Sequence, residues 1–286
     1  MSSNVGQHGR TDPVASDSGF APPGATAGRR ARIMAITSGK GGVGKTFLAA
    51  NLAAALARLG RRVLVLDADL GLANLDVVLN LHPKVTLHDV FTGKVALEDA
   101  ILPAPGGFSV LLAGSGLVEY SRLTPEVREQ LLHIIDTVAP RFDHVLIDTG
   151  AGISDVVLYA VSLADDVLVI TTPEPTSMTD AYATIKVLAT QQQRRDIRLV
   201  VNQVGRTGEG RAIRGQLQLV VDRFVAPMLA PDDNGAKPAP KLELLGELPL
   251  DPAVREAVQK RRLLLELLPG SEAARAVEAI AARLAP

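Results

Sequence analysis

The sequence predicts an α/β protein with one doubly wound, mainly parallel sheet and helices on both of its faces. Short apolar runs of strand length alternate with helix-prone runs from residue 31 to residue 286, which is the order expected of such a sheet. Several of the short runs are apolar at nearly every position, as strands buried on both faces are. Hydrophobic residues make up 47% of the chain and aromatic residues only 3%, so we expect a core of Leu, Val, Ile and Ala.

The chain divides into a tail and one domain. Residues 1–30 are rich in Ser, Gly, Pro, Ala and Asp and have no apolar periodicity, which predicts a disordered N-terminal tail. No linker interrupts residues 31–286. We therefore predict a single domain over residues 31–286, with C-terminal helices within residues 252–285.

Composition excludes several kinds of site and partner. The chain has no cysteine, which excludes disulfides, thiolate metal sites and cysteine-bound iron–sulfur clusters, and which fits a reducing cytoplasm. Its net charge of −1 gives no overall basic field that favours nucleic acid. No window approaches about 18 uninterrupted apolar residues, and the N-terminus lacks the apolar stretch of a signal peptide. We expect a cytoplasmic protein that does not bind nucleic acid.

The first predicted strand, Ile33–Thr37, leads into a glycine-rich loop, and a helix-prone run from Phe47 to Leu59 follows. Residues 39–46 match the phosphate-binding loop G-x-x-x-x-G-K-[ST] in the strand–loop–helix context that the motif needs. Its glycines let successive backbone N–H groups face phosphate oxygens, and the helix adds its positive dipole end. We expect Lys45 to reach the β- and γ-phosphates and Thr46 to ligate Mg²⁺. The predicted nucleotide-binding residues here are Gly39, Lys40, Gly41, Gly42, Val43, Gly44, Lys45, Thr46 and Phe47.

Two further predicted strands end in aspartate, Arg62–Asp67 and His144–Asp148. The carboxyl ends of parallel strands meet at the edge of the sheet where ligands bind. We therefore expect Asp67 to support Mg²⁺ through water and Asp148 to hold Mg²⁺ or its water shell. Asp69, two residues beyond the first of these strands, is expected to orient the attacking water. The sequence thus predicts a site for ATP and Mg²⁺.

Shorter elements are predicted between these two strands. Apolar periodicity predicts short helices at 87–91 and 96–101 and a strand at 108–113. Thr124 is expected to cap a helix that has Pro125 at its first position. The apolar face predicted for that helix consists of Val127, Leu131, Leu132 and Ile135.

The second half of the chain continues the alternation. The pattern predicts strands at 166–172, 197–202 and 242–248. It also predicts a helix that is opened by residues 173–180 and runs to about residue 192, an amphipathic helix at 209–229 and a loop at 230–240.

Two helices are predicted at the C-terminus, at about 252–268 and 271–285. The first combines the basic residues 260–262 with leucines between 263 and 268. Such a helix can lie in a membrane interface and give a peripheral contact with the inner face of the cell membrane. Its leucines can instead pack on the core as an ordinary covering helix, which the absence of aromatic anchors favours.

Lys40 lies five residues before Lys45, so that the loop reads K-G-G-x-G-K-T. This form resembles the deviant Walker A motif of the MinD/ParA class of ATPases. The resemblance implies that Lys40 reaches the nucleotide of a partner subunit and that Asp69 is catalytic. It also implies that Asn202 reads the adenine edge and that the loop beginning at Pro249 packs on adenine. The sequences of residues 67–74 (DADLGLAN) and 148–154 (DTGAGIS) resemble those of the FlhG/FleN branch, the flagellar-number regulators.

That resemblance implies an ATP-dependent homodimer that hydrolyses ATP slowly with Mg²⁺ and regulates flagellar number, placement and gene expression. Its implied partners are the flagellar SRP-type GTPase and a flagellar transcriptional activator. Members often carry an N-terminal D-Q-A-x-x-L-R element that stimulates the GTPase, and residues 1–31 contain none. The alternatives are division-site positioning as in MinD, partition as in ParA, and a non-hydrolysing scaffold gated by ATP. The partition alternative would require a basic DNA-binding face, which the charge disfavours.

Overall fold

The computed structural model describes residues 30–71, 73–114, 122–229, 231 and 239–285. Residues 1–29 of the predicted tail, and residues 230 and 232–238 of the predicted loop, lie outside the described residues. The strands are β1 (Arg32–Ser38), β2 (Val63–Ala68), β3 (Ile101–Pro103), β4 (Ser109–Leu111), β5 (His144–Ala151), β6 (Asp166–Thr171), β7 (Asp196–Val204) and β8 (Lys241–Pro249). The helices are α1 (Lys45–Arg58), α2 (Leu75–Leu79), α3 (Leu87–Phe91), α4 (Leu97–Ala100), α5 (Pro125–Val138), α6 (Asp155–Ser162), α7 (Pro175–Gln191), α8 (Glu209–Phe224), α9 (Pro252–Gln259), α10 (Leu264–Leu267) and α11 (Glu272–Leu284).

The described strands form an eight-stranded sheet in the order β3-β4-β2-β5-β1-β6-β7-β8. All neighbouring strands in it are parallel except β3 and β4, which pair antiparallel. The prediction of a mainly parallel, doubly wound sheet is confirmed. β1 lies between β5 and β6, so the loop after β1 opens at the centre of the carboxyl edge, where such sheets bind ligands.

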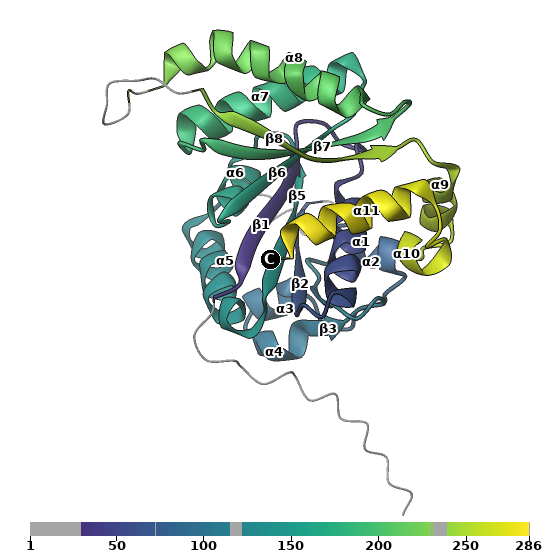
Figure 1. Cartoon of the computed structure of the whole chain (residues 1–286). Helices are drawn as coiled ribbons and strands as arrows, with labels where there is room; N and C mark the ends of the chain where they lie inside the picture. Colours follow the sequence, from purple (N-terminus) through teal and green to yellow (C-terminus); the bar gives the residue numbers. More distant parts are fainter. Residues whose placement is uncertain (1–29, 72, 115–121, 230, 232–238, 286) are drawn as a thin grey trace, which may run out of the picture.

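Helices cover both faces of this sheet (Figure 1). One buried cluster joins the sheet to α1, α2, α10 and α11, and the other joins its opposite face to α5, α6, α7 and α8. The middle strands β2 and β5 are buried along almost their whole length, which explains their uninterrupted apolar sequences. None of the helices in the described part of the chain has both the length and the apolar character needed to span a membrane.

The predicted helix at 252–268 is wrong as one element, because the chain forms α9 and then α10. The break falls between Lys260 and Leu263, where Arg261 has a φ of 49°, a backbone conformation that stops a helix. Leu263, Leu264 and Leu265 are at most 1% exposed and belong to the cluster around α1. These three leucines therefore pack on the core, as predicted for a covering helix, and do not face a membrane.

Three smaller predictions are also corrected. In α5 the inward face includes Ile134, whereas Leu132 is 45% exposed, because a step of three from Leu131 stays on the buried face and a step of one does not. Ile101 begins β3 instead of ending a helix. The helix predicted at 209–229 ends at Phe224, and a single 3₁₀ turn, Ala226–Met228, follows it.

Asn51 of α1 fixes the start of α10 and provides a test of this packing. Its side chain is buried, donates to the Phe47 carbonyl at 2.9 Å and accepts from the Leu264 N–H at 2.8 Å. Asn51→Ala leaves a buried N–H without its acceptor, which costs about 1–3 kcal/mol. We expect urea unfolding to show a loss of that size. Thr137→Ala, which removes an exposed hydroxyl bonded to a carbonyl of its own helix, is the control. Its free energy of unfolding should differ from that of the unchanged chain by less than about 0.5 kcal/mol. Equal losses in the two variants would contradict this role.

Candidate active site

The phosphate-binding loop turns sharply between β1 and α1, and its glycines are where the turn needs them. Gly42 and Gly44 have φ angles of 77° and 100°, which residues with a Cβ rarely adopt. A Cβ on Gly44 would also lie 2.4 Å from Asn202 Nδ2, and one on Gly39 would lie 2.2 Å from the Asp180 carbonyl oxygen. The loop is therefore packed against β7 and α7 and can take this shape only with glycine at these places.

Lys45 begins α1 with its ammonium group held close to the loop. Its Nζ donates to Ser38 Oγ at 3.0 Å, and that hydroxyl donates to the Lys40 carbonyl oxygen at 2.7 Å. The residue is only 8% exposed. Burial lowers the pKa of Lys45, while the nearby carboxylates of Asp148 and Asp69 act in the opposite direction. A buried cation beside a glycine loop is a site for a polyanion.

Two buried carboxylates stand next to each other at the end of the sheet. Asp67 of β2 pairs in register with Asp148 of β5, and each is 1% exposed. Burial, and then the charge of Asp148, raises the pKa of Asp67 well above its usual range. Burial also raises the pKa of Asp148 to about 7, although a hydrogen bond from Thr46 and the charge of Lys45 oppose the shift. Two such groups destabilise each other unless a proton or a cation lies between them.

These residues fit a magnesium ion. Asp67 Oδ2 and Asp148 Oδ1 are buried and have no hydrogen-bond partner among the described residues, which is costly unless a ligand satisfies them. The Thr46 hydroxyl adds a third oxygen beside Asp148. Within the described ranges no group of three or more His, Cys, Asp or Glu side chains is arranged to hold a metal. Mg²⁺ needs no such group, because it is usually bound by one or two carboxylates together with waters and phosphate oxygens.

The raised pKa of Asp148 predicts a pH-dependent stability. A carboxyl group with a raised folded pKa keeps its proton in the folded chain where the unfolded chain has lost it. The unfolding free energy therefore falls as pH rises from about 4 to about 7. Asp148→Asn removes this loss, so the nucleotide-free variant should be more stable than the unchanged chain at pH 8, by up to about 4 kcal/mol for a pKa raised from 3.8 to about 7, and equal to it near pH 4. Urea unfolding across this range measures the difference.

Asp143→Asn is the matched control of opposite sign. A hydrogen bond from the Arg62 side chain lowers the pKa of Asp143 despite its partial burial. The ionised Asp143 carboxylate therefore stabilises the folded chain above the pKa that this group has in the unfolded chain. This stabilisation is lost as pH falls through the pKa of Asp143 in the folded chain. Asp143→Asn should thus lose stability at pH 8 where Asp148→Asn gains it. Parallel stability curves for Asp148→Asn and the unchanged chain would contradict the assignment.

A cavity of about 580 Å³ opens in front of the phosphate-binding loop, a volume within the usual range of small-ligand sites. It is bounded by the loop, by the segment after β2 and by the end of β5. The predicted site residues that line it are Gly41, Gly42, Gly44, Lys45, Thr46, Phe47 and Asp69. Those that do not line it are Gly39, Lys40, Val43, Asp67, Asp148, Asn202 and Pro249. Most of the residues predicted to bind phosphate, and the residue predicted to orient the water, thus line one cavity. The two residues predicted to contact adenine do not line it.

Asp69 lies where the segment after β2 faces the end of β5. Its backbone N–H donates to Asp67 Oδ1 at 3.1 Å. A Cβ placed on Gly150 would lie 3.3 Å from Asp69 Oδ1, so the carboxylate packs closely on that glycine. The buried Asp67 therefore fixes the backbone of a second carboxylate that lines the cavity.

Lys40 points to α7 instead of into the cavity. Its Nζ donates to Glu174 Oε2 at 2.6 Å and to Thr176 Oγ1 at 3.1 Å, and its side chain is 38% exposed. This side chain is therefore at the surface, within reach of another molecule, while Lys45 is enclosed. Within the described chain the two lysines of the loop thus have separate surroundings.

Asn202 lies behind the phosphate-binding loop, near the end of β7. Its Nδ2 donates to the Val43 carbonyl oxygen at 2.8 Å, and its Oδ1 accepts from the Gln203 N–H at 2.9 Å. Both ends of the amide are therefore engaged in holding the loop to the sheet. Pro249 ends β8 and pairs in register with Val204. The roles of Asn202 and Pro249 toward adenine stay predictions.

The sequence-based prediction missed three residues that hold the two lysines: Ser38, Glu174 and Thr176. Ser38 bridges Lys45 and the Lys40 carbonyl, and the other two receive the Lys40 ammonium group. Ser38 could have been found, since it directly precedes the loop. Glu174 and Thr176 could not, because they are 134 and 136 residues from Lys40 and meet it only because β6 lies beside β1.

Comparison with known proteins agrees with this geometry. Residues 31–201 match a family model described as an AAA domain. The chain is 42% identical over 253 residues to the antiactivator FleN of Pseudomonas aeruginosa, an alignment that covers 88% of this chain and 86% of FleN. It is 31% identical to the flagellum site-determining protein YlxH of Helicobacter pylori, with 88% of this chain and 81% of YlxH covered.

A solved structure shows the same arrangement of strands and helices. The septum site-determining protein MinD of Pyrococcus horikoshii, complexed with Mg-ADP, superposes with a TM-score of 0.69 and 27% identity, covering 89% of this chain and 96% of MinD. The family model spans more than half of this chain, and the alignment with FleN spans most of both proteins. Together with the second lysine of the phosphate-binding loop, these matches show that the chain is a nucleotide-binding member of the MinD/ParA class of ATPases, in its FlhG/FleN branch.

Proposed function

We propose that this protein is an ATP-dependent, dimerising switch that regulates the number and placement of flagella and the expression of flagellar genes. The observation that carries the proposal is the 42% identity to the antiactivator FleN over most of both chains. The flagellum site-determining protein YlxH, which is 31% identical over a similar span, supports the same role. Division-site positioning, partition and a non-hydrolysing scaffold are the alternatives against which it is tested.

In this proposal the chain binds ATP and Mg²⁺ at the carboxyl edge of the sheet. The backbone N–H groups of residues 39–46 hold the phosphates, and Lys45 contacts the β- and γ-phosphates. Thr46, Asp67 and Asp148 would hold Mg²⁺ directly or through water. This assignment is supported by Asp67 Oδ2 and Asp148 Oδ1, which are buried without a hydrogen-bond partner among the described residues. Bound there, the ion would supply positive charge that offsets the charge on the transferred phosphoryl group.

Asp69 orients the water that attacks the γ-phosphate, since its carboxylate lines the cavity. Lys40 leaves Glu174 and reaches the nucleotide of a second copy of the chain, where its charge stabilises the transition state as an arginine finger does. Hydrolysis is slow, and it returns the protein to a monomer. Asn202 and Pro249 border the adenine ring in this proposal.

A switch of this kind acts through other proteins, and its proposed partners are a flagellar SRP-type GTPase and a flagellar transcriptional activator. The proposed location is the cytoplasm. A peripheral contact with the inner face of the cell membrane would have to use residues other than Leu263, Leu264 and Leu265, because these are buried.

Deletion of the gene in its own organism tests the proposal. Electron microscopy should show an altered number or position of flagella per cell, and flagellar transcripts should rise, as expected on loss of an antiactivator. The unchanged gene should restore both, and the gene with Lys40→Ala should not. Normal flagella beside misplaced septa or DNA-free minicells would instead favour division-site positioning, which the structural match to MinD makes the second candidate.

A further inference from the structure

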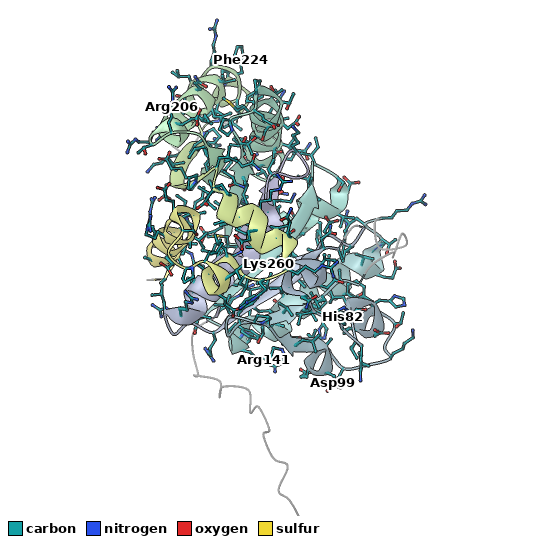
Figure 2. The ribbon with its side chains drawn as sticks, turned by 90° about the vertical axis from the view of Figure 1, so that its right-hand side faces the viewer. His82, Asp99, Arg141, Arg206, Phe224 and Lys260 are labelled. Atoms are coloured by element: carbon teal, nitrogen blue, oxygen red, sulfur yellow. The ribbon has the colours of Figure 1, made fainter. Side chains whose placement is uncertain are left out.

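Two neighbouring cavities lie at the amino edge of the sheet, opposite the phosphate-binding loop. The smaller has a volume of about 390 Å³ and lies at the amino ends of β4, β2 and β5. The larger has a volume of about 510 Å³ and lies at the amino ends of β5, β1 and β6. Both volumes are within the usual range of small-ligand sites. Figure 2 shows Arg141, which lines the smaller cavity, in the lower part of the molecule.

The smaller cavity combines apolar walls with guanidinium groups. Its apolar wall residues include Val63, Ile101, Pro103, Phe108 and Phe142. The two phenylalanines lie just before β4 and β5 and are at most 8% exposed. The charged residues that line the cavity are Arg61, Arg62, Arg141 and Glu98. Three cations and one carboxylate around an apolar space suit a ligand that is apolar in one part and negatively charged in another.

Two of the three arginines already have acidic partners. Arg62 donates from Nη2 to Asp143 Oδ1 at 2.9 Å and from Nε to Asp143 Oδ2 at 3.3 Å. Arg141 donates from Nη1 to Glu98 Oε1 at 3.4 Å. The one carboxylate that lines the smaller cavity is therefore engaged by Arg141, and each of these two cations has a carboxylate within hydrogen-bond distance.

Arg61 differs from these two arginines. It follows the turn that ends α1, and it lines both cavities. Its Nε is buried and has no hydrogen-bond partner among the described residues. Within the same ranges no ion pair includes Arg61. A buried N–H without an acceptor is costly unless a ligand or water supplies one.

We propose that the smaller cavity binds a small organic oxyanion. Its apolar part lies against Phe108 and Phe142, and its carboxylate or phosphate group accepts hydrogen bonds from the Arg61 guanidinium, whose planar shape suits both groups. Water alone would satisfy the guanidinium but would not cover the apolar walls. The inference goes beyond the proposed function, because it assigns a second small-molecule site at the edge of the sheet opposite ATP. Its test does not depend on dimerisation.

Isothermal titration calorimetry of the full chain tests the site, with Mg-ADP at saturation so that the phosphate-binding loop is occupied. The probes are naphthyl phosphate and octanoate, and naphthol and octanol are their uncharged counterparts. We expect at least one anion to bind one to one, at least about tenfold more tightly than its counterpart, as a charge-assisted hydrogen bond provides. The tighter anion shows which oxyanion the site takes. No saturable binding of either anion at millimolar concentration would overturn the proposal.

Arg61→Met locates the bound anion, because it removes the guanidinium and keeps an unbranched side chain. This variant should bind the anion at least about tenfold more weakly and the uncharged counterpart as the unchanged chain does. Arg206→Met, at an exposed arginine far from Arg141 (Figure 2), is the matched control and should bind the anion normally. Equal anion affinities of Arg61→Met and the unchanged chain would place the anion elsewhere and overturn the proposal.

Urea unfolding without ligand separates a binding role of Arg61 from a structural one. Arg61→Met should leave the unfolding midpoint unchanged or raise it, because it removes a buried N–H that has no acceptor among the described residues. Arg62→Met is the contrasting variant and should lower the midpoint, because it breaks the hydrogen-bonded pair with Asp143. A loss of stability in Arg61→Met as large as in Arg62→Met would show that Arg61 supports the fold, and would overturn the proposal.

Discussion

Asp69→Ala is expected to lower the rate of ATP hydrolysis by about 10²- to 10³-fold, the usual contribution of a group that positions or activates a reacting water. The carboxylate lines the cavity, and its backbone is held by Asp67, so it can act on a water there without ligating the metal itself. Nucleotide affinity should change less than about threefold, because in the proposed site the loop and Lys45 supply the phosphate contacts. Phosphate release with Mg-ATP and equilibrium binding of a fluorescent ATP analogue measure the two effects.

Asp99→Ala, at an exposed carboxylate of α4 that Figure 2 shows at the lower edge of the molecule, is the control for the loss of a negative charge. It should hydrolyse ATP at the unchanged rate. Normal hydrolysis by Asp69→Ala would show that the catalytic assignment is wrong. Loss of hydrolysis with intact regulation of flagellar genes would instead favour a scaffold that uses ATP only to fix its dimer.

Lys40→Ala is expected to abolish ATP-dependent dimerisation and to lower hydrolysis by about 10³-fold, the lower range of the effect of an arginine finger. In the proposed dimer this variant lacks the cation that reaches the phosphates from the other subunit. Binding of ATP by the single chain should persist, because the Lys40 side chain points to Glu174 and does not line the cavity. Lys45→Ala is the contrasting variant and should lose nucleotide binding itself. Gel filtration and nucleotide titration distinguish the two.

Glu174→Gln is the matched partner of Lys40→Ala. It removes the acid that holds Lys40 on α7 and leaves the lysine in place. We expect it to dimerise at an equal or lower ATP concentration than the unchanged chain. Normal dimerisation by Lys40→Ala would contradict a role for this lysine between subunits.

Much of the fold could be predicted from the sequence because the central strands are buried on both faces. Runs such as Val63–Ala68 and Val145–Ile147 leave no polar alternation to misread. The errors fall where the tertiary structure overrides local pattern. The leucine-rich stretch after Arg262 has the composition of one long helix, yet the start of α10 is held by hydrogen bonds that the Leu264 and Leu265 N–H groups donate to Asn51 Oδ1, a residue more than two hundred positions away. The edge strand β3 is three residues long and carries too little pattern to detect.

In the candidate site, too, some residues could be predicted from local sequence and others are brought together only by the tertiary structure. The phosphate-binding loop is one continuous segment whose glycines and lysines each have a local reason, so its residues could be named from spacing alone. Asp67 and Asp148 could be placed because each ends an apolar run in the sequence, although β5 itself continues to Ala151. The contact of Lys40 with Glu174 and the engagement of Asn202 with the Val43 carbonyl depend on strand order. The sequence pattern does not determine strand order.

The most direct test is the mass of the Asp69→Ala chain in solution with ATP and Mg²⁺, measured by multi-angle light scattering after gel filtration. With turnover blocked, the chain should elute at the mass of two copies with ATP and of one copy with ADP. Adding Lys40→Ala to it should return the ATP sample to one copy. A single-copy mass with saturating ATP and Mg²⁺ would contradict the switch and leave a protein that only binds nucleotide.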